Sequence, residues 1–164
     1  MIRLSNFCFK TWFQISAKNV RCSYENLKKL TNLFTSEHIV LIADDIKIDS
    51  SLFEFLKNNN LEYVFLRQYI RNVEVAVKVP IDFANYVLKE IISNNPENIF
   101  VFDLKENEKW KDKLQCTKET IVSRGNANIF VTIACDKNSI LLIANKDGYD
   151  FKTVYSYLKT NLHD

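Results

Sequence analysis

The chain reads His38-Ile39-Val40-Leu41-Ile42-Ala43-Asp44-Asp45 at residues 38–45. A short, continuous apolar run that is closed by acidic residues is typical of a β-strand buried on both faces, and such strands lie at the centre of a sheet. Residues 99–104 repeat this arrangement, with Asp103 close to the end of the run. We therefore expect a central strand at residues 38–43, which can have parallel neighbours, and a second buried strand at residues 99–104.

The rest of the chain alternates between strand and helix patterns. Strand-like periodicity or short apolar runs occur at residues 7–16, 61–66, 73–79, 120–123, 129–134 and 140–144. Helical spacing of apolar residues occurs near residues 23–34, 51–57, 82–93, 106–114 and 150–162. We expect one globular domain over residues 1–164, of the α/β or α+β class. We expect this domain to contain a mixed β-sheet covered by about four to five helices, and an antiparallel meander near the C-terminus.

Composition limits the class of protein. A chain of 164 residues that is 47% hydrophobic has enough apolar material to close one core. No stretch approaches the roughly 18 to 20 uninterrupted apolar residues of a membrane span. The N-terminus lacks the basic start and the apolar block of a signal peptide. We therefore expect a soluble, cytoplasmic protein that has no membrane among its partners.

Cysteine, glycine and charge argue against several kinds of site. The cysteines are irregularly spaced and include no C-x-x-C pair, so we expect free, buried thiols rather than a disulfide or a zinc site. These cysteines are Cys8, Cys22, Cys116 and Cys135. The 2 glycines exclude the G-x-G-x-x-G and P-loop phosphate-binding motifs. A net charge of +2 predicts that the partner is not nucleic acid.

Acidic residues follow both predicted buried strands. Asp44 and Asp45 end the first strand, and Asp103 ends the second. In open α/β sheets, ligands gather at the carboxyl ends of the strands, and three carboxylates there would form the all-oxygen site that Mg²⁺ prefers. The alternative is structural, because Asp is common in turns and at element ends. Two expectations therefore stay open: no cofactor, or Mg²⁺ held by these three residues.

The run from Ile39 to Asp45 resembles the first strand of phosphoacceptor receiver domains. The resemblance implies that Asp44 and Asp45 bind the metal and that Asp103 takes the phosphoryl group. The later strands lack the Thr/Ser and Lys-Pro ends of that family. A small Mg²⁺-dependent enzyme or phosphoacceptor is therefore the alternative function.

Candidate contact residues are charged or aromatic. Arg67, Tyr69 and Arg71 lie between two predicted strands, where they form either a ligand-binding turn or an ordinary polar hairpin turn. Exposed carboxylates and aromatic anchors also suit a protein partner. The full set of residues that we predict to contact a partner is Asp44, Asp45, Arg67, Tyr69, Arg71, Glu106, Glu108 and Trp110.

The chain resembles bacterial immunity proteins, which neutralise the toxins of competing bacteria, in its size, its richness in asparagine and aromatic residues, and its lack of a catalytic motif. The resemblance implies a cytoplasmic protein that occludes one cognate toxin, commonly a nuclease, by direct binding. We therefore expect an intracellular protein-binding module rather than an enzyme. A homodimer also stays open, because an edge strand of the sheet is free to pair.

Overall fold

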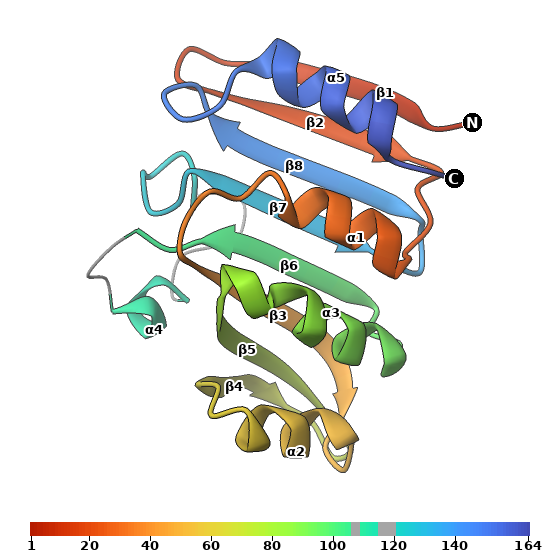
Figure 1. Cartoon of the computed structure of the whole chain (residues 1–164), viewed down its shortest axis with the longest axis vertical. Helices are drawn as coiled ribbons and strands as arrows, with labels where there is room; N and C mark the ends of the chain where they lie inside the picture. Colours follow the sequence, from red (N-terminus) through yellow and green to blue (C-terminus); the bar gives the residue numbers. More distant parts are fainter. Residues whose placement is uncertain (106–108, 115–120) are drawn as a thin grey trace.

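The computed structural model describes residues 1–105, 109–114 and 121–164. In these residues, eight strands form one sheet in the order β1-β2-β8-β7-β6-β3-β5-β4 (Figure 1). Every pair of neighbouring strands is antiparallel. The strands are β1 (Arg3–Cys8), β2 (Trp12–Lys18), β3 (His38–Lys47), β4 (Tyr63–Gln68), β5 (Asn72–Pro80), β6 (Asn98–Asp103), β7 (Ile129–Ala134) and β8 (Ser139–Asn145).

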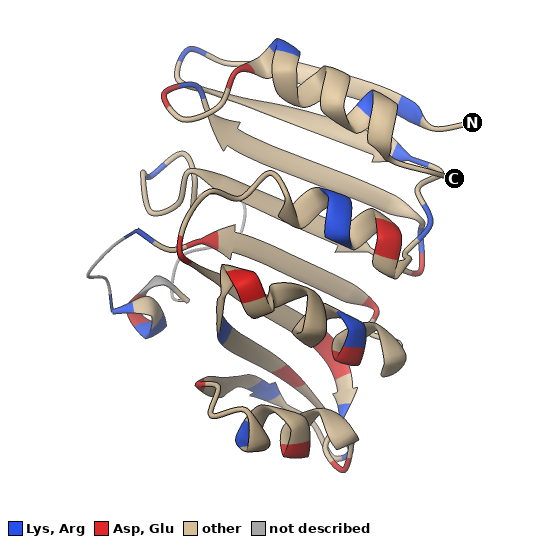
Figure 2. Ribbon diagram, in the orientation of Figure 1, with Lys and Arg blue, Asp and Glu red and all other residues tan. Residues whose placement is uncertain are grey.

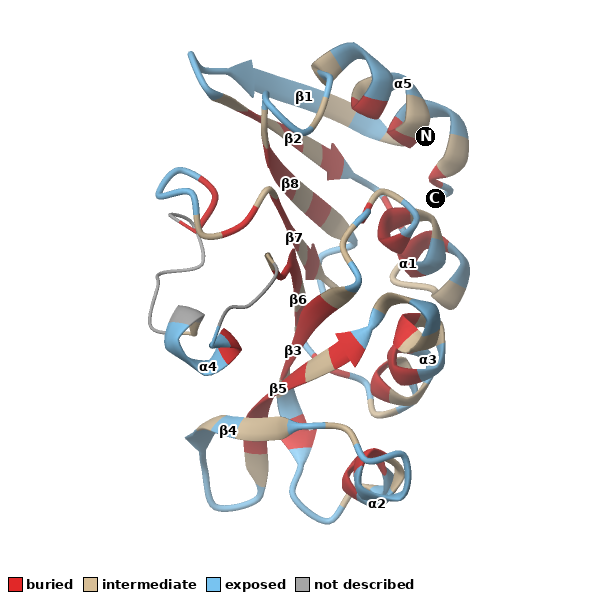
Figure 3. Cartoon of the chain, turned by 60° about the vertical axis from the view of Figure 1, so that its left-hand side comes forward, coloured by how far each residue is buried: buried red, intermediate tan, exposed pale blue. Residues whose placement is uncertain are grey.

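Five helices accompany the sheet in the described residues, and they are α1 (Tyr24–Thr31), α2 (Ser51–Asn58), α3 (Ala84–Ser93), α4 (Trp110–Lys113) and α5 (Phe151–Asn161). Helices α1, α2, α3 and α5 lie on one face, and the short α4 lies on the other (Figure 3). Ser23, Ser50 and Asp150 cap α1, α2 and α5 with side-chain oxygens, which accept N–H groups that the first turn leaves unpaired. Within the described part of the chain, none of the helices has the length and apolar content that crossing a membrane requires.

The central strand β3 is covered on both faces. Ile39, Leu41 and Ala43 belong to the core under the large helices, whereas Val40 and Ile42 belong to a second apolar cluster on the side of α4. A strand that is buried on both faces needs apolar residues at both parities. The run at residues 38–43 therefore predicted the position of this strand correctly.

The prediction of a mixed sheet was wrong, because β3 is antiparallel to both of its neighbours, β5 and β6. Double-sided burial makes a strand continuously apolar whatever the direction of the strands beside it. The fold is α+β. An antiparallel meander is present near the C-terminus, but its first strand is β6 rather than the predicted strand at residues 120–123: β6, β7 and β8 are antiparallel neighbours in chain order.

Some predicted elements have other forms in the structure. Residues 7–16 belong to a hairpin of β1 and β2, which is closed by a 2.8 Å hydrogen bond from the Phe9 N–H to the Trp12 carbonyl. Residues 121–125 form a turn instead of a strand, with Gly125 at a φ of +75°. Asp82 lies in a 3-10 turn before α3 and caps no helix. Part of the predicted helix at 106–114 lies outside the described residues.

Cys22 and Cys135 form a disulfide, with their Cα atoms 5.0 Å apart. The prediction of free thiols was therefore wrong for this pair, which lies 113 residues apart in the sequence. The fold brings together the segments that precede α1 and follow β7. Cys8 is free but exposed rather than buried, and Cys116 lies outside the described residues. Disulfides persist mainly in oxidising compartments, so the cytoplasmic location stays a prediction.

Candidate functional site

The antiparallel register separates the acidic residues that we expected to converge. Asp103 lies opposite Ile39, at the start of β3, whereas Asp44 follows Ala43, which lies opposite Ile99. Asp44 lies five positions further along the extended strand than Ile39, a distance of roughly 16 Å. If β3 and β6 were parallel, their acidic residues would lie at the same end of the two strands. Because the strands are antiparallel, Asp44 and Asp103 lie at opposite ends of the strand pair.

Asp44 and Asp103 each bind a neighbouring asparagine. Asp44 accepts the backbone N–H of Asn98 at 2.6 Å and its side-chain amide at 2.8 Å. Asp103 accepts the same two groups of Asn128, at 2.8 and 3.0 Å, and also the Ile129 N–H at 3.0 Å. Both oxygens of each carboxylate are thereby engaged, as in the structural alternative that the sequence left open.

Asp45 occupies a bulge in β3. The register with β5 shifts between Ala43 and Ile46, and Asp45 has a φ of +55°. Its side chain is exposed and accepts a 2.6 Å hydrogen bond from the Asn72 amide. The bulge turns Asp45 toward solvent at the end of the sheet, next to the start of β5.

The geometry does not assemble the predicted Mg²⁺ site. In the residues that the structure describes, no group of three His, Cys, Asp or Glu side chains is placed to hold a metal ion. A phosphoacceptor also needs a carboxylate oxygen that can reach its donor, whereas both oxygens of the buried Asp103 bind main-chain or amide N–H groups. The receiver-like assignment of these three residues therefore finds no support in their arrangement.

The turn between β4 and β5 presents aromatic, aliphatic and cationic side chains together. We call Arg67, Gln68, Tyr69, Ile70 and Arg71, together with the adjoining Ile48, the hairpin tip. Ile70 is 98% exposed and Tyr69 is 62% exposed. The Ile48 N–H donates to the Arg71 carbonyl at 2.9 Å, which holds the connection between β3 and α2 against the turn. Hydrophobic side chains this exposed contribute little to the core.

The charges around the hairpin tip are mixed. Lys47, Arg67 and Arg71 are exposed, and their side chains form no salt bridge with any residue that the structure describes. Asp45 and Asp49 are exposed on the adjoining segment. Basic and acidic segments alternate over the described chain rather than gathering on one side (Figure 2). This pattern fits a mixed protein surface better than a polyphosphate backbone.

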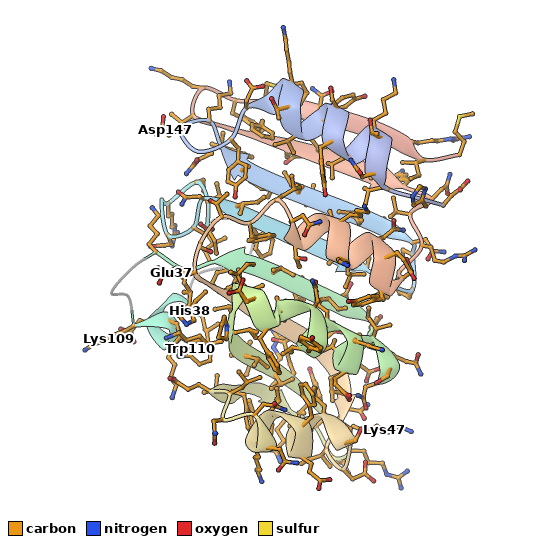
Figure 4. All side chains as sticks on the ribbon, in the orientation of Figure 1. Glu37, His38, Lys47, Lys109, Trp110 and Asp147 are labelled. Carbon is orange, nitrogen blue, oxygen red and sulfur yellow. A yellow bond between two sulfur atoms is a disulfide. The ribbon has the colours of Figure 1, made fainter. Side chains whose placement is uncertain are left out.

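Trp110 is not available as a surface anchor, which corrects our prediction. Its side chain is 4% exposed and belongs to the apolar cluster on the α4 face, and its Nε1 donates to Glu62 Oε2 at 3.0 Å. Figure 4 shows Trp110 and Lys47 at opposite ends of the strands. Lys47 lies at the end where the hairpin tip is found. Glu106 and Glu108, also predicted as contacts, lie outside the described residues.

Sequence reasoning missed several exposed apolar residues. Ile70 and Ile48 belong to the hairpin tip, and Phe7 and Phe9 lie in the β1–β2 hairpin, where Phe9 stacks on Trp12 with ring centroids 3.9 Å apart. Phe7, Phe9 and Phe13 have one parity, so a single half-buried strand over residues 7–16 would have turned all three toward the core. Only the position of the turn, which reverses the chain between Phe9 and Trp12, separates the buried from the exposed ones.

Comparison with known proteins adds no assignment. No protein-family model matches the chain, and none of the curated proteins matches it. Among solved structures, the chain is similar to the regulatory subunit of aspartate kinase from Thermus thermophilus in its ligand-free form, with 13% identity and a TM-score of 0.31. The match covers 77% of this chain and 93% of that one. Similarity at this level carries no argument about function.

Proposed function

We propose that this protein is a protein-binding module whose contact surface is centred on the hairpin tip. The observation that carries the proposal is the exposure of Ile70 and Tyr69 on a turn that also carries Arg71, with Arg67 near the end of the adjoining β4. Tyrosine and arginine are enriched among the residues that dominate interface energies. A protruding apolar side chain contributes most binding free energy when it is buried in a pocket on the partner.

The shape and charge of the tip favour a protein partner of a particular kind. Lys47, Arg67 and Arg71, which form no salt bridge within the described part of the chain, suit an acidic contact surface. Asp45 and Asp49 stand beside them and would repel a row of phosphates. A net charge of +2 over 164 residues likewise supplies little long-range attraction to nucleic acid. The partner that this surface fits is therefore a protein with an apolar pocket bordered by carboxylates.

The finer proposal is an immunity protein that neutralises a cognate bacterial toxin by direct binding. Its support is the general resemblance in size, composition and lack of a catalytic motif, together with an exposed contact surface of the right chemistry. The hairpin tip replaces Asp44 and Trp110 as the expected centre of contact, because Asp44 is held by Asn98 and Trp110 is buried. The cationic tip also favours an acidic surface of the toxin over a basic, nucleic-acid-binding cleft.

The experiment is to pair the purified chain with the toxin encoded beside it. We expect a one-to-one complex by calorimetry and protection of cells in which the toxin is expressed. Ile70→Asp should remove both, because it places a charge in an apolar pocket. Absence of binding to that toxin would contradict the immunity proposal. Binding that Ile70→Asp leaves intact would instead contradict the location of the contact surface.

A further inference from the structure

Strand β1 leaves one edge of the sheet open. It is the outermost strand, β2 is its only neighbour among the residues that the structure describes, and all of its residues except the half-buried Leu4 are exposed. Figure 3 shows β1 almost entirely in the colour of exposed residues, at the end of the sheet beyond β2. The large apolar side chain of Phe7 is 65% exposed. Open edges of this kind are templates for pairing with another strand.

The hydrogen-bonding pattern identifies which main-chain groups face outward. The Phe9 N–H donates to the Trp12 carbonyl across the hairpin, and antiparallel pairs alternate between bonded and non-bonded positions. Phe7, Ser5 and Arg3 therefore bond to β2, with which β1 keeps an unbroken register over its whole length. Leu4, Asn6 and Cys8 direct their N–H and carbonyl groups away from the sheet.

The opposite edge of the sheet is protected, and this difference points to β1. In β4, the register with β5 shifts between Phe65 and Arg67, and bulges of this kind bend an edge strand away from incoming partners. Arg67 adds an exposed charge on that edge. Strand β1 has neither a bulge nor a proline, and its one charged residue, Arg3, lies at its start.

We infer that β1 pairs with β1 of a second copy of this chain, antiparallel and centred on Asn6. This is the one antiparallel register in which all three outward-facing residues find outward-facing partners: Asn6 meets Asn6 of the partner subunit, and Leu4 meets Cys8 of the partner subunit. Each such pair exchanges two main-chain hydrogen bonds. The two sheets then continue across the two-fold axis, and the open edge of both copies is removed.

The side chains of β1 are compatible with this pairing. The register sets Ser5 opposite Phe7 of the partner subunit and keeps the two copies of Arg3 apart, so no like charges meet across the axis. Leu4 also lines a groove of about 450 Å³ between β1 and α5, together with Tyr155 and Leu162. The partner strand borders this groove and shields its apolar wall from water. A second copy therefore satisfies the main chain of β1 and covers the apolar wall of this groove.

Sedimentation velocity over a range of concentrations tests the inference. All samples carry Cys8→Ser, so that a disulfide through this exposed thiol cannot imitate the dimer. We expect a species of twice the 19.3 kDa chain mass that dissociates on dilution. Asn6→Lys and Asn6→Glu should each be monomeric, because identical charges would face each other across the axis. A mixture of the two variants should restore the dimer.

Two controls keep the result interpretable. Asn6→Ala keeps the main chain and should remain dimeric, and circular dichroism melting reports whether each variant is folded. A Cys8→Ser chain that stays monomeric at millimolar concentration would overturn the inference. So would a dimer that survives Asn6→Lys in a folded protein. Ile70→Asp, which tests the hairpin tip, should leave the dimer unchanged, so the two proposals fail separately.

Discussion

Asp103 binds Asn128 through both of its carboxylate oxygens: Oδ1 accepts the backbone N–H at 2.8 Å, and Oδ2 accepts the side-chain amide at 3.0 Å. The amide oxygen of Asn128 in turn accepts the Asn145 amide at 2.7 Å. These bonds join the end of β6 to the start of β7 and the end of β8. A residue that resembled a reactive carboxylate in the sequence is a connector of three strands in the structure.

Replacing Asp103 should therefore destabilise the fold. Asp103→Ala leaves the N–H groups of Asn128 and Ile129 without their acceptor in a buried setting, and we expect a loss of about 2 to 4 kcal/mol in the free energy of unfolding. Asp103→Asn keeps one acceptor oxygen, so its free energy of unfolding should fall less than that of Asp103→Ala. Urea unfolding of the three proteins measures both differences. An alanine variant as stable as the natural chain would refute the structural role.

The Cys22–Cys135 disulfide should contribute strongly to stability. It spans 113 residues of sequence, and cross-links that close loops of this length stabilise by about 4 to 5 kcal/mol in the chain-entropy account. Cys22→Ser should lower the urea midpoint accordingly, whereas Cys8→Ser, at the exposed free thiol, should not. Non-reducing peptide mapping identifies the linked pair. Two alkylatable thiols at Cys22 and Cys135 in the oxidised protein would contradict the bond.

The phenol of Tyr149 should make stability depend on pH in the alkaline range. Burial, with a smaller contribution from the Asp103 carboxylate, raises the pKa of Tyr149 from 10.0 to about 12, and its hydroxyl donates to the Leu33 carbonyl at 2.8 Å. Because the folded state holds this proton more tightly, its stabilising effect is complete below pH 10.0 and is lost as the pH rises toward about 12.

Tyr149→Phe provides the comparison for this effect. The variant should be less stable at neutral pH, because it loses the hydrogen bond to Leu33. Its free energy of unfolding should fall less steeply between pH 10 and about 12 than that of the natural chain. Urea unfolding at several pH values measures the two slopes. Identical slopes would show that the phenol titrates alike in the folded and unfolded states.

The positions of the main strands could be predicted from the sequence, but their directions could not. Residues 38–43 and 99–104 are apolar at both parities because helices cover one face of β3 and β6 and the α4 side covers the other. That pattern is the same for parallel and antiparallel neighbours. Strand direction depends on where the connections run, and the connection from β3 to β6 contains α2, β4, β5 and α3.

The candidate site could be predicted only in part. Tyr69 and Arg71 were correctly placed in a turn between strands, because turn residues interrupt the alternation of β4 and β5, whereas Arg67 belongs to the end of β4. The acidic set failed because its convergence depended on strand direction. Trp110 failed because its place among charged residues suggested a surface helix, whereas its ring is buried and its Nε1 binds Glu62. The direction of the strands and the burial of Trp110 both depend on contacts between segments far apart in the sequence.

Magnesium should have no effect on the stability of this protein. A ligand that binds only the folded state raises the unfolding midpoint, and Asp44, Asp45 and Asp103 do not lie together to bind one. Thermal melts with and without millimolar Mg²⁺ should therefore coincide. A midpoint that rises with Mg²⁺, and does so no longer in Asp45→Ala, would restore the metal-dependent alternative.

The most direct test of the hairpin tip compares two tyrosines of nearly equal exposure. Tyr69, in the tip, is 62% exposed, and Tyr86, on α3, is 63% exposed. We would measure, by calorimetry, the dissociation constant of each alanine variant with the proposed cognate toxin, sought as the product of the gene beside that of this chain. Tyr69→Ala should weaken binding by about 30-fold or more, as expected for an interface anchor, and Tyr86→Ala should leave it unchanged. Equal affinities of the two variants for the toxin, or weaker binding by Tyr86→Ala alone, would contradict binding through the hairpin tip.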